Sequence, residues 1–205
     1  MNKNLLLLLC GIVSLFQFPF SSAQAQQIGP GKDLIDSAVI GDIKNFVDTD
    51  IVRFSISNQN EKYGSISEAQ IIEVDKKWRA ETKSDDQPLI SATLSNPLSS
   101  YLTRIQARSA GLYTEMFVMD RNGLNVGQSN ITSDYWQGDE AKFQKTFPAD
   151  VGSVFVDDPE FDKELGIWRV QVNMSVANNE KSSNIGAITV EINLSELARR
   201  SAITQ

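Results

Sequence analysis

Residues 134–140, Asp-Tyr-Trp-Gln-Gly-Asp-Glu, place two adjacent aromatic side chains among carboxylates and an amide. Aromatic rings can stack on a small molecule while neighbouring polar groups fix its orientation, and this mixture is typical of a binding pocket. Tyr135, Trp136 and Asp139 are therefore candidate ligand-binding residues. A structural interpretation stays open, in which Trp136 covers the hydrophobic core and Asp139 or its neighbour begins the next helix.

A second polar segment, which precedes the longest alternating run of the chain, is acidic and contains Asp157, Asp158, Glu160 and Asp162. Such a group raises the question of Ca²⁺, which prefers several carboxylate and carbonyl oxygens. The spacing of a calcium loop is absent, and Pro159 fixes the backbone in the middle of the group. We predict no metal site here, and a solvated acidic turn is the plainer interpretation.

Two residue types that carry much of enzyme chemistry are scarce or missing. The chain has no histidine and a single cysteine, Cys10. Ser-His-Asp and Cys-His catalysis, histidine-bound zinc or copper, and a histidine pH switch are therefore excluded. Acid–base catalysis would need a carboxylate pair such as Asp139 with Asp157, and nothing in their spacing requires one. We predict a protein that is not an enzyme and that uses no cofactor.

The first 25 residues have the features of a signal peptide. Lys3 precedes an almost unbroken apolar run over 5–20, and Ala23-Gln24-Ala25 supplies the small residues of a cleavage site. We expect cleavage after Ala25, with an uncleaved membrane anchor as the alternative. The mature chain would be periplasmic, and no second apolar stretch of about 18 residues follows that could span the membrane.

The charge of the mature chain bears on its partners. Cleavage would remove Lys3 from the 19 basic residues, which leaves 18 against 26 acidic residues and a net charge of −8. Phosphate backbones would be repelled, so no nucleic acid partner is expected. The length of 26–205 suits one domain with its own core.

The spacing of apolar residues predicts helices in the first half of the mature chain and strands in the second. One long helix is predicted over 33–58, and others over 67–82 and 97–111, with Ser67 and Asn96 as N-caps. The strands are expected at 112–119, 124–129, 154–156, 166–177 and 185–192, with short helices at 139–147 and 195–201. This order predicts an α+β fold with an antiparallel sheet.

Polar side chains on these strands raise further candidates. Arg169 could reach an anionic ligand, but a cross-strand ion pair with Glu191 is the simpler use. Tyr113 and Glu115 alternate with Leu112, Thr114 and Met116 on the first strand, so one of the two sets faces the pocket side. The sequence leaves open which set this is. Trp78, on the second helix, is expected in the core.

The turn Asp120-Arg121-Asn122-Gly123 joins the first two strands and predicts a hairpin, because glycine accepts a positive φ. The order of strand, this turn, strand, and an aromatic-bearing segment that opens a helix resembles the ligand-binding half of extracytoplasmic Cache domains, the PAS-like periplasmic sensors. The resemblance covers roughly the C-terminal two-thirds of the chain. It implies a long N-terminal helix packed on the back of the sheet and a ligand on its front.

The resemblance also implies roles for individual residues. In Cache domains that bind amines and amino acids, an aromatic-x-Asp pattern on a strand gives a carboxylate to the ligand's ammonium group. Phe155-Val156-Asp157 fits this pattern, with Asp158 as the alternative, and 134–140 would line the pocket. Those domains hold an α-carboxylate with an arginine two residues before the tryptophan, where this chain has Asp134. An amine or an uncharged polar ligand is implied instead of an α-amino acid.

These observations predict a free-standing periplasmic sensor domain that binds a small molecule and reports it to a membrane-bound signalling protein. A receptor of the family normally continues into a second transmembrane helix and a signalling domain, whereas this sequence stops at Gln205. An exported structural or interaction protein with an empty cleft is the alternative, followed by a histidine-free, carboxylate-based hydrolase.

Overall fold

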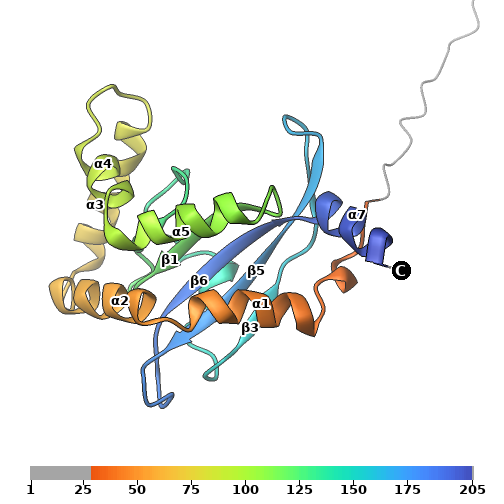
Figure 1. The fold of residues 1–205 in the computed structure, drawn as a ribbon. Coiled ribbons are helices and arrows are strands. Elements are labelled where there is room, and N and C mark those ends of the chain that lie inside the picture. The colour runs from red at the N-terminus through yellow and green to blue at the C-terminus, as the bar shows by residue number, and fades with distance from the viewer. Residues whose placement is uncertain (1–28, 205) are drawn as a thin grey trace, which may run out of the picture.

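The computed structural model describes residues 29–204, which form a curved antiparallel sheet with most of the helices on one side (Figure 1). The signal peptide predicted over 1–25 lies outside these residues. The helices are α1 (Ser37–Val47), α2 (Asp50–Lys62), α3 (Glu68–Glu81), α4 (Pro88–Leu94), α5 (Pro97–Arg108), α6 (Ala141–Gln144) and α7 (Leu194–Thr204). The strands are β1 (Tyr113–Met119), β2 (Asn125–Gln128), β3 (Val154–Val156), β4 (Glu160–Asp162), β5 (Ile167–Ala177) and β6 (Asn184–Asn193). Within 29–204, no helix has the length and apolar character needed to cross a membrane.

The strands lie in the order β2-β1-β6-β5-β3, and β4 pairs with β5 beyond the end of β3. Every neighbouring pair is antiparallel. The predicted α+β fold with an antiparallel sheet is therefore confirmed. Alternation along the strands gives the sheet two different faces, which we call the back, covered by α1, α2 and α5, and the front.

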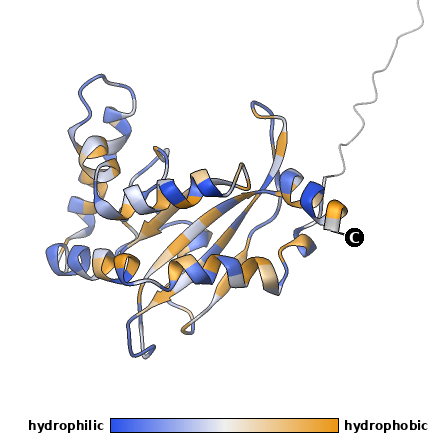
Figure 2. Ribbon diagram, in the orientation of Figure 1, coloured by the Kyte–Doolittle hydropathy of each residue, from blue (hydrophilic) through white to orange (hydrophobic). Residues whose placement is uncertain are grey.

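The back of the sheet carries the main hydrophobic core. Strand residues such as Met116, Val172 and Ile188 pack there against helix residues such as Ile43 and Leu102. Figure 2 shows hydrophobic residues concentrated along the strands that these helices cover. Burial of this apolar surface is the main source of stability.

The helix predicted over 33–58 is interrupted in the structure. α1 ends at Val47 and α2 begins at Asp50, and Thr49 between them is extended, with φ −123° and ψ 154°. The Arg53 guanidinium donates to the Asp48 carbonyl at 3.2 Å, and the Thr49 hydroxyl donates to the Phe46 carbonyl at 3.2 Å. The Thr49 side chain thus bonds the backbone locally, which favours a break over continuation of the helix.

Two elements escaped the sequence prediction. No element was predicted where α4 lies. Pro88 stands at its start, and the buried Glu81 carboxylate accepts from the amides of Leu89 at 2.7 Å and Ile90 at 3.0 Å. β4 was expected to be an acidic turn, but Phe161 lies opposite Trp168 and their rings are 5.5 Å apart.

The hairpin between β1 and β2 is confirmed. Gly123 has φ +78°, and the buried Asp120 carboxylate accepts from the amides of Asn122 at 2.8 Å and Leu124 at 3.0 Å. The Gly123 carbonyl then accepts from the Gln137 amide at 2.8 Å. The turn therefore fixes the start of the segment that follows β2.

Candidate functional site

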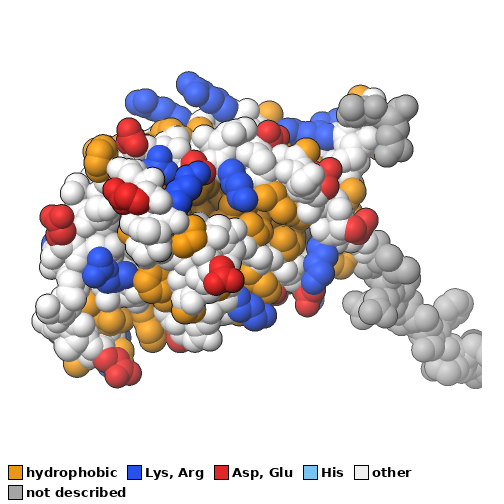
Figure 3. All heavy atoms as spheres, turned by 90° about the horizontal axis from the view of Figure 1, so that it is seen from below, with side chains coloured by type: hydrophobic (Ala, Val, Ile, Leu, Met, Phe, Trp, Pro, Cys, Tyr) orange, Lys and Arg blue, Asp and Glu red, His pale blue; other side chains and the backbone are white. Residues whose placement is uncertain are grey.

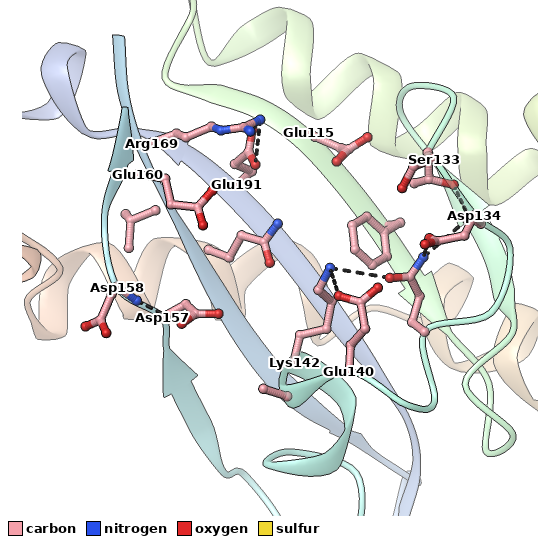
Figure 4. Close-up of a pocket in the computed structure, with 16 residues that line it drawn as sticks. Glu115, Ser133, Asp134, Glu140, Lys142, Asp157, Asp158, Glu160, Arg169 and Glu191 are labelled. Carbon is pink, nitrogen blue, oxygen red and sulfur yellow. Dashed lines mark hydrogen bonds and ion pairs between the residues drawn. The ribbon is translucent and has the colours of Figure 1, made fainter. Parts of the chain in front are cut away.

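A cavity of about 360 Å³ lies on the front of the sheet (Figure 4). Its floor is formed by β1, β6 and β5, one side by the 132–137 segment and α6, and the other by residues around β3 and β4. The front face is open here because α6 is only four residues long, whereas three long helices cover the back. The same strands therefore bury a core on one side and line a polar cavity on the other.

Helix α3 fixes the position of the 132–137 segment, which forms one wall of the cavity. Asp75 accepts from the amides of Tyr135 at 2.9 Å and Trp136 at 3.1 Å. Arg79 then bonds Asp75 at 2.7 Å and the Asp134 carboxylate at 3.2 Å. This chain of polar contacts positions the wall and also pairs one cavity-lining carboxylate, that of Asp134, with a cation.

The cavity is strongly acidic. Its carboxylates are Glu115, Asp134, Glu140, Asp157, Asp158, Glu160 and Glu191, and its cations are Lys142 and Arg169. A cavity lined in this way favours positively charged ligands, because opposite charges attract strongly where solvent is partly excluded. On the molecular face seen in Figure 3, by contrast, charged side chains of both signs are interspersed.

Four of the seven carboxylates have a positively charged partner. Asp134 pairs with Arg79 and accepts from Gln137, and Glu140 pairs with Lys142 at 2.8 Å. The remaining two are Asp158, which pairs with Lys32 at 2.6 Å, and Glu191, which pairs with Arg169 at 3.4 Å. The predicted Arg169–Glu191 cross-strand ion pair is thereby confirmed.

Glu115, Asp157 and Glu160 form no ion pair within the described residues. One Asp157 oxygen accepts from the amide of Asp158 at 2.9 Å. The pKa of Glu115 is raised to about 7, first by burial and then by the nearby Glu191, while Lys142 and Arg169 act in the opposite direction. A ligand's cation would offset the charge of these three groups.

A bulge in β1 places Glu115 in the cavity. Pairing with β6 shifts between Tyr113 and Glu115, so that Glu115 lies directly opposite Glu191. The Thr114 hydroxyl donates to the Glu191 carboxylate at 2.8 Å. Glu115 and Phe117 therefore face the front. Tyr113, expected on the same face as Glu115, lies before the bulge and packs on Phe46 in the back core, with the ring centroids 5.5 Å apart.

Of the six candidate residues from the sequence, Asp157 and Asp158 line the cavity. Tyr135, Trp136, Asp139 and Phe155 do not line it. Tyr135 is 4% exposed and packs on Trp78, with the ring centroids 5.2 Å apart, in a separate hydrophobic cluster. Burial raises the pKa of the Tyr135 hydroxyl. Trp78 is fully buried, as predicted.

The other three candidates have different surroundings. The Trp136 indole nitrogen donates to the Asn122 carbonyl at 2.9 Å. Asp139 is exposed to solvent. The Phe155 ring lies under the Lys145 ammonium, which is 4.1 Å from its centroid. The structure therefore brings two carboxylates of the predicted set together and places the aromatic residues elsewhere.

The sequence reasoning named Glu115, Arg169 and Glu191 on the cavity floor but did not propose Gln171 as part of a site. Arg169, Gln171 and Asn173 occupy alternate positions of β5 and are all polar, whereas the residues between them are apolar and face the back core. A run of polar residues at one parity of a long strand is the signal that could have indicated a front-face site. Within 29–204, no group of three or more acidic or thiol side chains is arranged to hold a metal ion.

No family model matches the chain, and neither does any curated protein with which it was compared. Solved structures to which it is similar are ligand-binding sensory domains of chemoreceptors and histidine kinases. The Campylobacter jejuni chemoreceptor Tlp3 domain with 4-methylisoleucine is 16% identical, with a TM-score of 0.38, over 75% of this chain and 64% of that one.

Two further structures have comparable sequence identities, TM-scores and coverage. The Pseudomonas aeruginosa amino acid chemoreceptor PctC domain with GABA is 14% identical, with a TM-score of 0.35, over 78% of this chain and 62% of that one. The Vibrio cholerae histidine kinase DctB sensor domain is 18% identical, with a TM-score of 0.37, over 79% of this chain and 58% of that one. The chain thus spans less than two-thirds of the length of each of these domains.

Proposed function

We propose that this protein is a periplasmic sensor domain that binds a small, positively charged molecule, an amine, in the front cavity and reports it to a membrane-bound signalling protein. The observation that carries the proposal is the cavity itself, in which seven carboxylates face two cations, and three of the seven form no ion pair within residues 29–204. Binding a cation there would offset charge that the empty protein holds partly shielded from water.

A binding role is also favoured over a catalytic one. The chain has no histidine, and the carboxylate pair considered for acid–base chemistry, Asp139 with Asp157, is divided between solvent and the cavity. The front face is open to solvent on the side away from the core helices, so a ligand can enter without unpacking the main core.

Three probes with the same four-carbon chain and a different charge test this proposal. We expect butylammonium to raise the melting temperature of the mature chain, butyramide to do so less, and butyrate not at all. A ligand at about 100 times its Kd adds roughly 2.7 kcal/mol to the free energy of unfolding. Stabilisation by butyrate alone, or by none of several cationic, neutral and anionic probes, would contradict the proposal.

The Asp157→Asn variant should weaken binding of a cationic probe by about tenfold or more, because a charged hydrogen bond is lost. Its melting temperature without ligand should stay close to that of the unaltered protein, since the Asp157 side chain forms no ion pair with the part of the chain that the structure describes. Calorimetric titration measures the affinity. Unchanged affinity would show that the cation binds another carboxylate of the cavity.

A further inference from the structure

Four residues lie in one row across the floor of the cavity. Glu115 on β1 faces Glu191 on β6, and Glu191 faces Gln171 on β5. The amide of Asp157 donates to the Gln171 carbonyl at 3.0 Å, which continues the row beyond β3. Glu115 and Asp157 are thus the two ends of a row that crosses four neighbouring chain segments. Figure 4 shows these two residues on opposite sides of the cavity.

The charges along this row are uneven. Both ends are carboxylates without an ion pair in the described part of the chain. Of the two inner residues, Glu191 is paired with Arg169 and bonded by Thr114, and Gln171 is a neutral amide. The row therefore presents negative charge at its ends and little net charge in its middle.

The spacing of strands sets the length of the row. Neighbouring strands lie about 4.8 Å apart, so three steps separate the backbones of Glu115 and Asp157 by about 14 Å. Side chains that extend into the cavity shorten the gap between the two carboxylates. One ammonium group cannot contact both ends, whereas two ammonium groups on a flexible aliphatic chain can.

We propose that the ligand is a linear diamine or polyamine that lies along this row, with one terminal ammonium at Asp157, the other at Glu115, and its methylene chain over Glu191 and Gln171. This inference rests on the proposed function and adds a second cation site to it. Phe117, the next front-facing residue of β1, also lines the cavity and offers apolar surface beside the row. Divalent recognition is favoured because each end offers a carboxylate that forms no ion pair within residues 29–204.

The experiment compares amines of equal chain length with one or two ammonium groups. Calorimetric titration of the mature protein with 1,4-diaminobutane and its longer α,ω-diamine homologues, against the matching monoamines, should show the best diamine binding at least about tenfold more tightly than its monoamine. Equal affinities for both series would overturn the inference and leave the proposed function standing. Binding of neither series would overturn both.

Variants then locate the two ends. Glu115→Gln and Asp157→Asn should each remove the preference for the diamine, while Asp139→Asn, whose side chain lies outside the cavity, should keep it. Glu115→Asp retracts one carboxylate by a methylene, so the best diamine should become longer. Should Glu115→Gln retain the full preference with the protein folded, Glu115 is not the second site and the inference fails.

Discussion

The front and the back of one sheet differ sharply although the same strands form both. On the back, Met116, Val190 and Val172 pack into a dry core under α1, α2 and α5. On the front, their immediate neighbours Glu115 and Glu191 line an acidic cavity. Because side chains alternate along a strand, one residue separates a stabilising position from a binding position.

The two faces also differ in energetic terms. Back-face residues gain stability from buried apolar surface. On the front, Glu115 and Glu191 are carboxylates directly opposite each other on neighbouring strands, an arrangement that destabilises a sheet. The front therefore holds unfavourable charge in the empty protein, and the back core compensates for it. Truncation of an apolar side chain on the back should therefore lower the free energy of unfolding, whereas neutralisation of Glu115 on the front should raise it.

The largest effect is expected on the back. Ile188→Ala should lower the free energy of unfolding by about 2–5 kcal/mol, because Ile188 is fully buried in the core and the change leaves a cavity. Urea denaturation measures the loss. Gln171→Ala on the front of the neighbouring strand is the matched control and should change stability by no more than about 0.5 kcal/mol. Equal losses on both faces would break the comparison.

The second-largest effect on stability is expected at Gly123, in the turn that bonds the segment forming one wall of the cavity. Gly123→Val should cost about 1–3 kcal/mol through its positive φ, and a Cβ there would lie 2.6 Å from the Gly138 Cα. Gly111→Val is the control, because Gly111 also has a positive φ but open space around it. A larger loss at Gly123 than at Gly111 in thermal denaturation isolates the contact with the wall. Equal losses would show that the wall yields freely.

Local sequence patterns predicted much of the fold. The Asn122-Gly123 turn predicted the hairpin and the alternation over 166–177 predicted β5, since both signals depend on adjacent residues. α4 was missed because its N-terminus is capped by Glu81, from the preceding helix. β4 was missed because three residues are too short to show a period.

The site was harder to predict than the fold. Asp157 and Asp158 were singled out, but the partner positions across the sheet depend on register, which is a non-local property. The bulge in β1 that aligns Glu115 with Glu191 has no signature in the sequence. Tyr135 and Trp136 carried the strongest local signal for a pocket, yet α3 draws their backbone away from the cavity through Asp75.

A smaller effect is expected for Trp136→Ala, which should reduce stability by about 1–2 kcal/mol because the bond to the Asn122 carbonyl and the packing on Gly138 are lost. Its affinity for a cationic probe should stay within a few-fold of that of the unaltered protein. Asp157→Asn should show the reverse pattern, so the pair separates structural from binding positions. Loss of affinity without loss of stability in Trp136→Ala would return the ring to the binding site.

The smallest effect comes from the front face and depends on pH. The Glu115 pKa is raised to about 7 in the folded protein, above its ordinary value of 4.5, so the folded state holds its proton over a pH range in which the unfolded chain has lost it. Stability therefore falls as pH rises from about 4.5 to 7, and stays lower above that range.

Glu115→Gln removes this dependence of stability on pH. The variant should be more stable than the unaltered protein at pH 8, by up to about 1 kcal/mol after screening by solvent in the cavity. At pH 5 most of that difference should vanish. Urea denaturation at both pH values measures it, with Asp139→Asn as a control outside the cavity. A variant that is less stable at pH 8 would show that the Glu115 carboxylate is compensated in the empty protein, and the contrast between the two faces would then be one of polarity alone.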